Sequence, residues 1–228
     1  MIVYGKNVAK EYLNNNKKIK KIILLNGFND KEIISLIEKR NLKYEYRDKK
    51  DFYQFDNYSH QGIILDVEDF SYSNLDDITE DPNSKIIILD HIEDPHNFGA
   101  IIRTVEAAGI SGIIIPKDRS VSVNGTTIKT SAGAINNVKI VEVTNIVNTI
   151  NELKEKGFWI IGTDMDGEDY RNLDYKGKIA AIIGNEGKGI GTNVKNNCDY
   201  IARIPMNGKI NSLNASVAAA IIIYEMIR

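Results

Sequence analysis

Two polar side chains, Asn97 and Arg103, occur in the segment that directly follows the strongly apolar run 85–89. Such a run is typical of a buried strand, and ligands of open parallel sheets bind beyond the carboxyl ends of the strands. Asn97 occupies the N-cap position before the helical pattern 98–108, and Arg103 interrupts that otherwise small and apolar helix. Both are candidates for binding or catalysis. The alternatives are simple capping for Asn97 and a structural ion pair for Arg103.

The same segment contains potential metal ligands, namely Asp90, His91, Asp94 and His96. The histidines lack the i, i+4 spacing of a helical metal site, and no second cluster of ligands occurs elsewhere in the sequence. The pattern therefore favours a protein without a metal. Covalent catalysis has no support either, because the sequence has no G-x-S-x-G elbow and Cys198 has no evident base partner.

A glycine-rich loop at 182–191 follows another apolar strand. Glycine lets the backbone come close to a ligand and adopt a positive φ. The loop is not a P-loop, because Ile182 and Gly189 stand where that motif needs Gly and Ser or Thr. It is not a dinucleotide fingerprint either, because Thr192 replaces the last glycine. We expect a ligand-binding loop of another kind with Glu186 as its functional side chain; the alternative is a turn with a solvated glutamate.

A third segment, 204–220, leads from the end of a strand through a polar loop into a helix rich in small residues. Ser212 is the expected N-cap of that helix. Small side chains allow the helix to pack tightly on another element. Taken alone, this pattern indicates no more than a well-capped helix in the core.

The elements before residue 68 alternate between helix and strand. Apolar patterns predict helices at 7–13 and after Asp30, which is placed as an N-cap, and strands at 21–25, 43–47 and 62–67. Tyr44 and Tyr46 fall on one side of the strand at 43–47. These elements predict a small α/β domain at 1–67. The acidic, aperiodic stretch 68–84 is expected to be a linker.

The rest of the chain, 85–228, reads as a larger α/β domain. Near-continuous apolar runs predict strands at 85–89, 112–115, 138–143, 158–162, 179–184 and 200–204. Runs that are apolar on both faces are typical of a parallel sheet covered on both sides. Helical patterns lie between them at 98–108, 145–156 and 213–226, so we expect a doubly wound domain.

The charge balance limits how the protein can bind nucleic acid. Its 228 residues contain 29 Lys and Arg and 31 Asp and Glu, which gives a net charge of −2. A uniformly basic surface is therefore excluded, whereas a local basic patch is not. The best candidate is the lysine cluster, which comprises Lys17, Lys18, Lys20 and Lys21. Its alternative is a solvated basic face before a strand.

No targeting or membrane segment is evident. The first residues lack the basic start and apolar stretch of a signal peptide. The most apolar segment, 213–227, is shorter than the roughly 20 residues of a membrane span and contains Asn214, Ser216 and Glu225. A single cysteine cannot form an intrachain disulfide, which fits a reducing compartment. We expect a soluble cytoplasmic protein without a membrane partner.

Taken together, the three segments resemble the SpoU-type branch of the SPOUT RNA methyltransferases, which methylate the ribose 2′-hydroxyl of tRNA and rRNA. The matching motifs are N-x-G-x-x-x-R at 97–103, G-N-E-G-x-G at 184–189 and I-P-M…S-L-N-x-S-x-A at 204–218, in this order. The resemblance implies that the parallel-sheet domain contains a deep trefoil knot. It also implies S-adenosylmethionine as the cofactor, held by the loops of the knot.

The resemblance further implies roles for single residues. The catalytic set would be Asn97, Arg103, Glu186 and Asn214, with Ser212 beside it. The cofactor would contact Gly184, Ile204 and Leu213, together with Met206 and Thr163. Lys188 joins the lysine cluster as a predicted RNA contact, and Arg119 and Lys129 are further candidates near the knot.

The role of Arg103 stays open between two chemistries. By resemblance it would accept the proton of the ribose hydroxyl, helped by an RNA phosphate. A free guanidinium, however, has a pKa above about 12. Arg103 would then stabilise the developing alkoxide and hold phosphate instead. In both cases we expect it to be essential.

The N-terminal segment supports a choice of substrate. Residues 3–7 and 60–62 resemble the ends of a small substrate-binding domain similar to L30e-like RNA binders. This favours the subgroup that methylates a guanosine in the peptidyl-transferase region of 23S rRNA. The alternatives are a tRNA guanosine, an rRNA adenosine, or a non-catalytic RNA-binding factor in ribosome assembly. The resemblance also implies a homodimer formed through the knotted domain.

Overall fold

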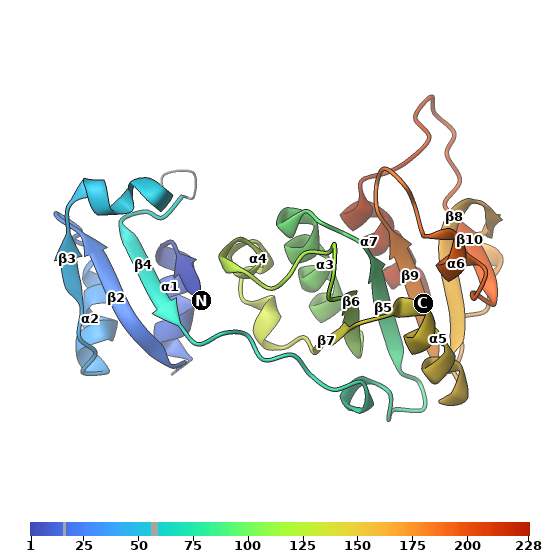
Figure 1. The fold of residues 1–228 in the computed structure, drawn as a ribbon, viewed down its shortest axis with the longest axis horizontal. Coiled ribbons are helices and arrows are strands. Elements are labelled where there is room, and N and C mark those ends of the chain that lie inside the picture. The colour runs from blue at the N-terminus through green and yellow to red at the C-terminus, as the bar shows by residue number, and fades with distance from the viewer. Residues whose placement is uncertain (16, 56–58) are drawn as a thin grey trace. The chain divides into compact units, whose positions relative to one another are not determined.

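The computed structural model describes residues 1–15, 17–55 and 59–228, and the chain forms two compact units (Figure 1). The first unit combines Met1–Ser71 with Val123–Gly133. The second combines Tyr72–Ser122 with Ala134–Arg228. A small N-terminal α/β unit followed by a larger one was predicted from the sequence, and this order is confirmed.

The first unit is built on a four-stranded sheet with the order β1-β4-β2-β3. β2 and β3 are parallel, and the other pairs are antiparallel. The elements are β1 (Ile2–Tyr4), α1 (Lys6–Asn14), β2 (Ile19–Leu25), α2 (Lys31–Lys39), β3 (Glu45–Arg47), the 3-10 helix η1 (Lys49–Phe55), β4 (Ile63–Val67) and α4 (Gly125–Ser131). As predicted, the Asp30 side chain caps α2, since its carboxylate accepts the Ile33 amide.

α4 was not predicted, and it joins the first unit although it comes from the second half of the chain. It packs on β1, where the Tyr4 hydroxyl lies 2.6 Å from Thr126 Oγ1. Gly125 starts the helix against the Ile2 carbonyl, and a Cβ at this position would lie 2.6 Å from that oxygen. Glycine is therefore required for this close approach.

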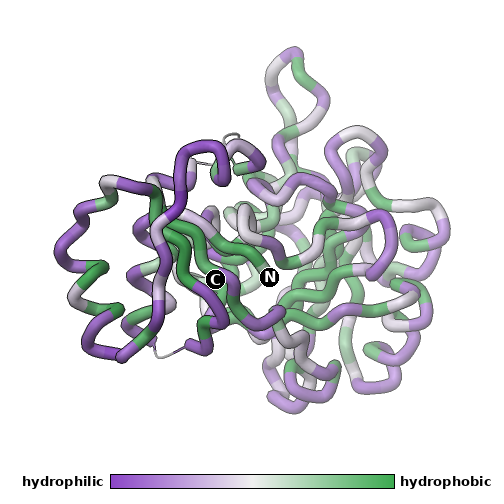
Figure 2. The backbone as a smooth tube through the Cα atoms, turned by 60° about the vertical axis from the view of Figure 1, so that its left-hand side comes forward, coloured by the Kyte–Doolittle hydropathy of each residue, from purple (hydrophilic) through white to green (hydrophobic). Residues whose placement is uncertain are grey.

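The second unit contains a six-stranded, entirely parallel sheet with the order β10-β8-β9-β5-β6-β7. The strands are β5 (Lys85–Asp90), β6 (Gly112–Pro116), β7 (Ile140–Val143), β8 (Trp159–Asp169), β9 (Ile179–Gly184) and β10 (Tyr200–Arg203). Its central strands β5 and β9 are hydrophobic and almost fully buried, and hydrophobic strands are drawn in green in Figure 2. The predicted parallel-sheet α/β domain is thus confirmed; its knot stays a prediction.

Helices cover both faces of this sheet. α5 (Ile146–Glu155) packs in one core cluster with alternate strand residues such as Ile88 and Ile182. α3 (Pro95–Ala108) and α7 (Ala215–Met226) pack on each other, and α7 also packs on β9. The remaining helices are short, namely α6 (Thr192–Lys195) and the 3-10 helices η2 (Asp76–Ile78), η3 (Ala134–Asn136) and η4 (Tyr170–Asn172).

Most of the predicted linker 68–84, from Tyr72 onwards, belongs to the second unit. Within it, η2 places Ile78 in the core at 2% exposure. The Ser84 hydroxyl donates to the Ile78 carbonyl oxygen at 2.5 Å, and the Ser73 amide donates to the Ile140 carbonyl oxygen. Contacts of this kind order a segment whose composition indicates a linker.

Candidate active site

A cavity of about 420 Å³ lies at the carboxyl ends of β9 and β10, beside the middle of β8. Its walls come from residues 163–165 of β8, from the loops that follow β9 and β10, and from the start of α7. All the residues predicted to contact the cofactor line it, namely Thr163, Gly184, Ile204, Met206 and Leu213. Glu186, Lys188 and Ser212 line it as well. This edge of a parallel sheet is where such folds bind their ligands.

The glycine-rich loop is closed by backbone contacts. The Asn185 amide donates to the Gly189 carbonyl oxygen at 3.1 Å, and the Gly189 amide donates back to Asn185 at 2.8 Å. A Cβ at position 184 would overlap the backbone of Gly189, and Gly189 itself has a φ of +65°. Both glycines are therefore needed to form the wall of the cavity.

The Glu186 carboxylate joins its own loop to the starts of α3 and α7. Its Oε1 accepts hydrogen bonds from Asn97 Nδ2 at 2.6 Å, Asn214 Nδ2 at 2.9 Å and the Ala215 amide at 3.2 Å. Asn214 Nδ2 also donates to Asn97 Oδ1 at 2.9 Å. The anion lies at the N-terminus of α7, where the helix dipole favours negative charge. We call these three side chains the amide–carboxylate cluster.

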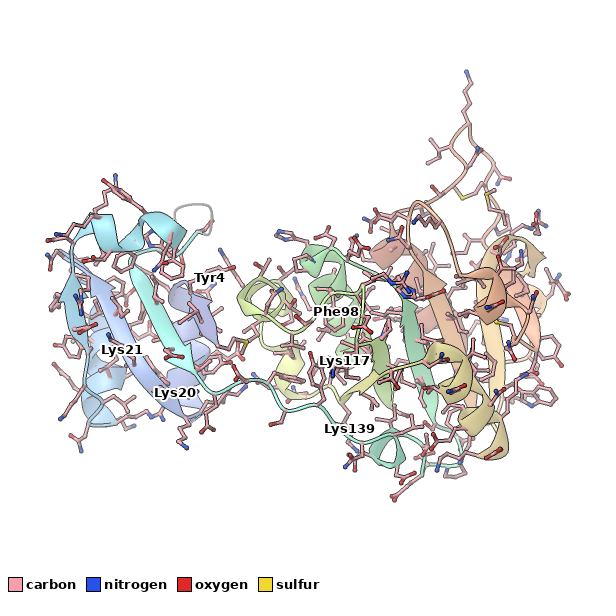
Figure 3. All side chains as sticks on the ribbon, viewed as in Figure 1. Tyr4, Lys20, Lys21, Phe98, Lys117 and Lys139 are labelled. Atoms are coloured by element: carbon pink, nitrogen blue, oxygen red, sulfur yellow. The ribbon has the colours of Figure 1, made fainter. Side chains whose placement is uncertain are left out.

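Asn97 is not the N-cap of its helix, so that expectation was wrong. α3 begins two residues earlier at Pro95, and the Asp94 carboxylate caps it by accepting the His96 amide at 2.8 Å. Proline suits the first helical position because its φ is already fixed there. Asn97 instead lies in the first turn, 8% exposed, next to the buried Phe98 (Figure 3), and its amide is free to reach Glu186.

Ser212 does not cap α7, which is a second correction. Asn214 does so, because its Oδ1 accepts the Ser216 amide at 2.9 Å and the Val217 amide at 3.4 Å. The loop stays irregular for two residues longer than predicted, and this leaves Ser212 on the wall of the cavity. Asn214 thus caps the helix with its oxygen and binds Glu186 with its nitrogen.

Arg103 lies on the exposed side of α3 and does not line the cavity. It is about 9 Å further along the helix than Asn97, given a rise of about 1.5 Å per residue. Its guanidinium makes no ion pair or hydrogen bond with any residue that the structure describes. The alternative that Arg103 forms a structural ion pair is therefore not supported, because no described residue is its partner.

The predicted lysine cluster is largely paired with acidic or aromatic groups. Lys18 contacts Glu68 at 2.5 Å and Lys21 contacts Glu45 at 2.6 Å. Lys17 lies 4.9 Å from the centroid of the Tyr12 ring, and burial lowers the pKa of its ammonium. Lys20 (Figure 3) makes no hydrogen bond or ion pair within the described residues, although its charge acts on Asp69.

The other predicted basic contacts do not form one patch. Lys188 lines the cavity described above, whereas Arg119 lines another cavity of about 470 Å³ near the ends of β5, β6 and β7. Lys129 belongs to the first unit, where it donates to the Ser59 carbonyl oxygen at 3.2 Å.

Asp90 is a positioning residue that the sequence analysis considered only as a metal ligand. It is 2% exposed, and its Oδ2 accepts the Gly191 amide at 2.7 Å while Oδ1 contacts His91 Nδ1 at 2.5 Å. Asn185 Nδ2 donates to the His91 carbonyl oxygen at 3.0 Å. The end of β5 thus fixes the glycine-rich loop. Across the described ranges, no three His, Cys, Asp or Glu side chains are arranged to hold a metal ion.

A ligand-sized cavity at the carboxyl edge of a parallel sheet, with a carboxylate held by amides at its rim, is typical of α/β proteins that bind a small molecule at this edge. The sequence identifies the family. Residues 84–224 match the SpoU rRNA Methylase family, and residues 2–73 match the domain described as RNA 2′-O ribose methyltransferase substrate binding. The chain belongs to the SpoU rRNA methylase family, whose methyl donor is S-adenosylmethionine, and it is an RNA methyltransferase.

Known proteins resemble the chain over its full length. YacO of Bacillus subtilis, named for the TrmH family of tRNA/rRNA methyltransferases, is 40% identical over 99% of this chain and 94% of its own. The AdoMet-bound rRNA methyltransferase of Sinorhizobium meliloti is 27% identical, with a TM-score of 0.79 over 99% of this chain and 85% of its own. The AdoMet complex of AviRb from Streptomyces viridochromogenes shares the fold, with a TM-score of 0.82 at 22% identity over 100% and 89%.

A tRNA-modifying relative matches a shorter part. The TrmH/SpoU tRNA modifying enzyme of A. aeolicus is 31% identical, with a TM-score of 0.58 over 63% of this chain and 74% of its own. The family-model matches and the full-length relatives confirm the predicted family, fold class and enzyme class. Within the described residues, every helix is too short or too polar to cross a membrane.

Proposed function

We propose that this protein transfers a methyl group from S-adenosylmethionine to the ribose 2′-hydroxyl of a guanosine in 23S rRNA, in the cytoplasm and as a homodimer. The observation that carries the proposal is the amide–carboxylate cluster at the rim of the cavity. It brings together the three motifs on which the resemblance rests, through hydrogen bonds of 2.6 to 3.2 Å.

The lining of the cavity suits S-adenosylmethionine. Its volume of about 420 Å³ lies in the range of small-molecule sites. Ile183, Ile204, Met206 and Leu213 supply apolar wall for the uncharged parts of the cofactor. The Glu186 carboxylate also lines the cavity and matches a cationic sulfonium in charge, whereas the Asp164 carboxylate in the same wall is paired with Lys195 at 3.1 Å.

Bound S-adenosylmethionine supplies a methyl group that is already activated for displacement. The protein then has to position the ribose hydroxyl and stabilise the charge that develops on its oxygen. The amide–carboxylate cluster holds the loop wall and the start of α7 in one arrangement. Arg103, exposed and unpaired among the described residues, is suited to hold an RNA phosphate, and it accepts the ribose proton or stabilises the alkoxide.

The coverage of the relatives supports rRNA as the substrate. The rRNA methyltransferase of S. meliloti matches 99% of this chain, whereas the tRNA-modifying enzyme of A. aeolicus matches 63%. The part missing from the shorter match is comparable in length to residues 2–73, which match the substrate-binding domain. A tRNA guanosine is the second candidate, because the B. subtilis relative is named for both substrates.

The deep trefoil knot and the homodimer are part of this proposal. Dimerisation is supported by large side chains that α7 exposes, including Val217 at 47% and Tyr224 at 54%. Sedimentation velocity of the purified protein tests the dimer directly.

Methyl transfer tests the proposed function. Tritiated S-adenosylmethionine is offered with rRNA and with tRNA from a strain that lacks this gene, and the labelled RNA is digested to nucleosides. We expect 2′-O-methylguanosine in large-subunit rRNA, lost with Arg103→Ala and retained with Arg171→Ala, an exposed arginine paired with Asp169. Label in tRNA or on adenosine would favour the alternatives. If neither free rRNA nor ribosomal particles became labelled, the proposal that this protein methylates rRNA would be contradicted.

A further inference from the structure

Three tyrosines are exposed within a short stretch of the first unit. Tyr44 is 36% exposed, Tyr46 is 46% and Tyr53 is 60%. We propose that residues 43–53, which we call the tyrosine segment, form the surface that binds unpaired bases of the RNA substrate, with Tyr46 as the central stacking ring. This inference rests on the proposed function, and it names the side chains through which the first unit holds RNA.

Tyr46 lies in β3, and Tyr44 directly precedes this strand. β3 is the outermost strand of its sheet, so one of its edges has no neighbouring strand. The rings of Tyr44 and Tyr46 lie with centroids 5.7 Å apart at an interplanar angle of 81°. This edge-to-face pair restrains both side chains before any base arrives. A ring fixed in advance loses little conformational entropy when a base stacks on it.

Charged groups in the segment favour an anionic strand. Lys43, Lys49 and Lys50 are exposed and make no hydrogen bond or ion pair with any described residue. Of the three acidic side chains, Glu45 contacts Lys21 and Arg47, Asp48 accepts Asn26 Nδ2 at 2.6 Å and Asp51 is exposed. With four basic side chains against these three acids, the segment has a net charge of +1. Three available ammonium groups beside three exposed rings are the combination with which proteins bind single-stranded nucleic acid.

The lysine cluster is a weaker candidate for this role. Lys18 and Lys21 each face a carboxylate at 2.6 Å or less, so each pair adds no net positive charge to the surface. Lys17 is half-buried, and its ammonium lies 4.9 Å from the centroid of the Tyr12 ring. Exposed lysines without a described partner also occur elsewhere in the first unit, namely Lys20, Lys31 and Lys39. Among the described residues of this unit, however, exposed tyrosine rings occur only in the tyrosine segment.

Binding of a fluorescent, unstructured RNA oligonucleotide to the full-length protein tests the proposal. Tyr46→Leu removes the ring and keeps an apolar side chain, whereas Tyr46→Phe keeps the ring. Tyr200→Leu is the matched control, because Tyr200 is 45% exposed and also belongs to a ring pair, with Trp159, at 5.7 Å. Thermal melting of each variant shows that the fold is retained.

We expect Tyr46→Leu to weaken RNA binding about 5- to 160-fold, the range of one lost base stack. Tyr46→Phe and Tyr200→Leu should stay within about twofold of the wild type. Wild-type affinity of Tyr46→Leu would overturn the proposal, and so would an equal loss with Tyr200→Leu. If Tyr46→Leu kept its affinity for RNA but no longer bound a protein that the wild type binds, the tyrosine segment would be a protein-binding surface instead.

Methyl transfer separates this proposal from the proposed function. If the wild type methylates rRNA and Tyr46→Leu has an unchanged KM for RNA, the tyrosine segment is not the RNA surface although the proposed function holds. If Tyr46→Leu raises KM and leaves kcat unchanged, the segment binds substrate. If the wild type binds the oligonucleotide through Tyr46 but transfers no methyl group, the proposed function fails while the RNA surface stands.

Discussion

The amide side chains beside Glu186 have properties that charged donors would lack. Asn97 donates to the carboxylate and accepts from Asn214, while the two Asn214 hydrogens go to Glu186 and Asn97. Lysine or arginine in these places would neutralise Glu186, but amides hold the carboxylate and leave its charge. Three neutral donors on one oxygen therefore position an anion at the cavity without pairing it.

Asn97→Asp replaces the donor that lies 2.6 Å from Glu186 with a second acceptor. Two carboxylates at this distance cannot both ionise without repulsion, so one of their pKa values rises. We expect methyl transfer to fall at least about 10-fold at pH 8 and to recover partly as the pH decreases, because a shared proton restores the hydrogen bond. Initial rates from pH 5.5 to 8 measure this. Asn97→Ala is the control, and an identical pH profile for both variants would contradict the explanation.

Burial raises the pKa of the Cys198 thiol from 9.0 to about 11. Because the folded state favours the neutral thiol, its contribution to stability is present below pH 9 and lost as the pH rises through about 11. A rise of about two units leaves roughly 100-fold less thiolate. We expect iodoacetamide at pH 8 to alkylate Cys198 about 100-fold more slowly in the native protein than in denaturant, as followed by mass spectrometry. Equal rates would disprove the shift.

At the scale of elements, the start of α7 serves two purposes through one residue. The Asn214 oxygen caps the helix and its nitrogen binds Glu186. The helix therefore cannot shift its first turn without moving the carboxylate. This couples the position of α7, which also packs on α3 and β9, to the wall of the cavity.

Substitutions at Asn214 separate the two purposes. Serine can still cap the helix but cannot donate to both partners, so Asn214→Ser should melt within about 2 °C of the wild type and lose at least about 10-fold in methyl transfer. Asn214→Ala should lose activity and also about 0.5–2 kcal/mol of cap stability, which is about 1–8 °C for a chain of this size. Thermal melts and rates measured side by side test this. A Ser variant with full activity would show that the amide donor is dispensable.

The sequence predicted the elements that have strong periodicity and missed those that depend on distant contacts. The strand at 179–184 was predicted at its full length, because its isoleucines and alanines are buried on both faces. β8 extends to Asp169, although 163–169 is polar, because Ala202 and Arg203 pair with its end after a register shift. Pro95 moved the start of α3, and no local signal assigns α4 to the first unit.

The candidate site was predictable in its members but not in its hydrogen bonds. Motif resemblance indicated Thr163, Gly184, Ile204, Met206 and Leu213, and all of them line the cavity. That Glu186 binds Asn97 and Asn214 is a long-range contact, which periodicity cannot indicate. The exposed position of Arg103, away from the cavity lining, was also not readable from spacing.

At the scale of the whole molecule, the chain passes between the two units three times, near residues 71, 122 and 133. Cutting the first connection therefore leaves the N-terminal part attached through α4. We expect that a protein with a protease site inserted after Ser71 still elutes as one species after cleavage. Gly125→Val, which would press on the Ile2 carbonyl, should release the fragment. Separate elution of the cleaved wild type would contradict the division into units.

The position of α4 in the sequence also determines when the first unit can finish folding during synthesis. The first 71 residues leave the ribosome well before 123–133, so the first unit stays without one of its helices while about 50 further residues are added. At roughly 5–20 residues per second, the delay is about 3 to 10 s. Throughout this time the face of β1 that α4 later covers is open to solvent or to a chaperone. The nascent chain therefore completes its N-terminal unit only when the other unit is already partly made.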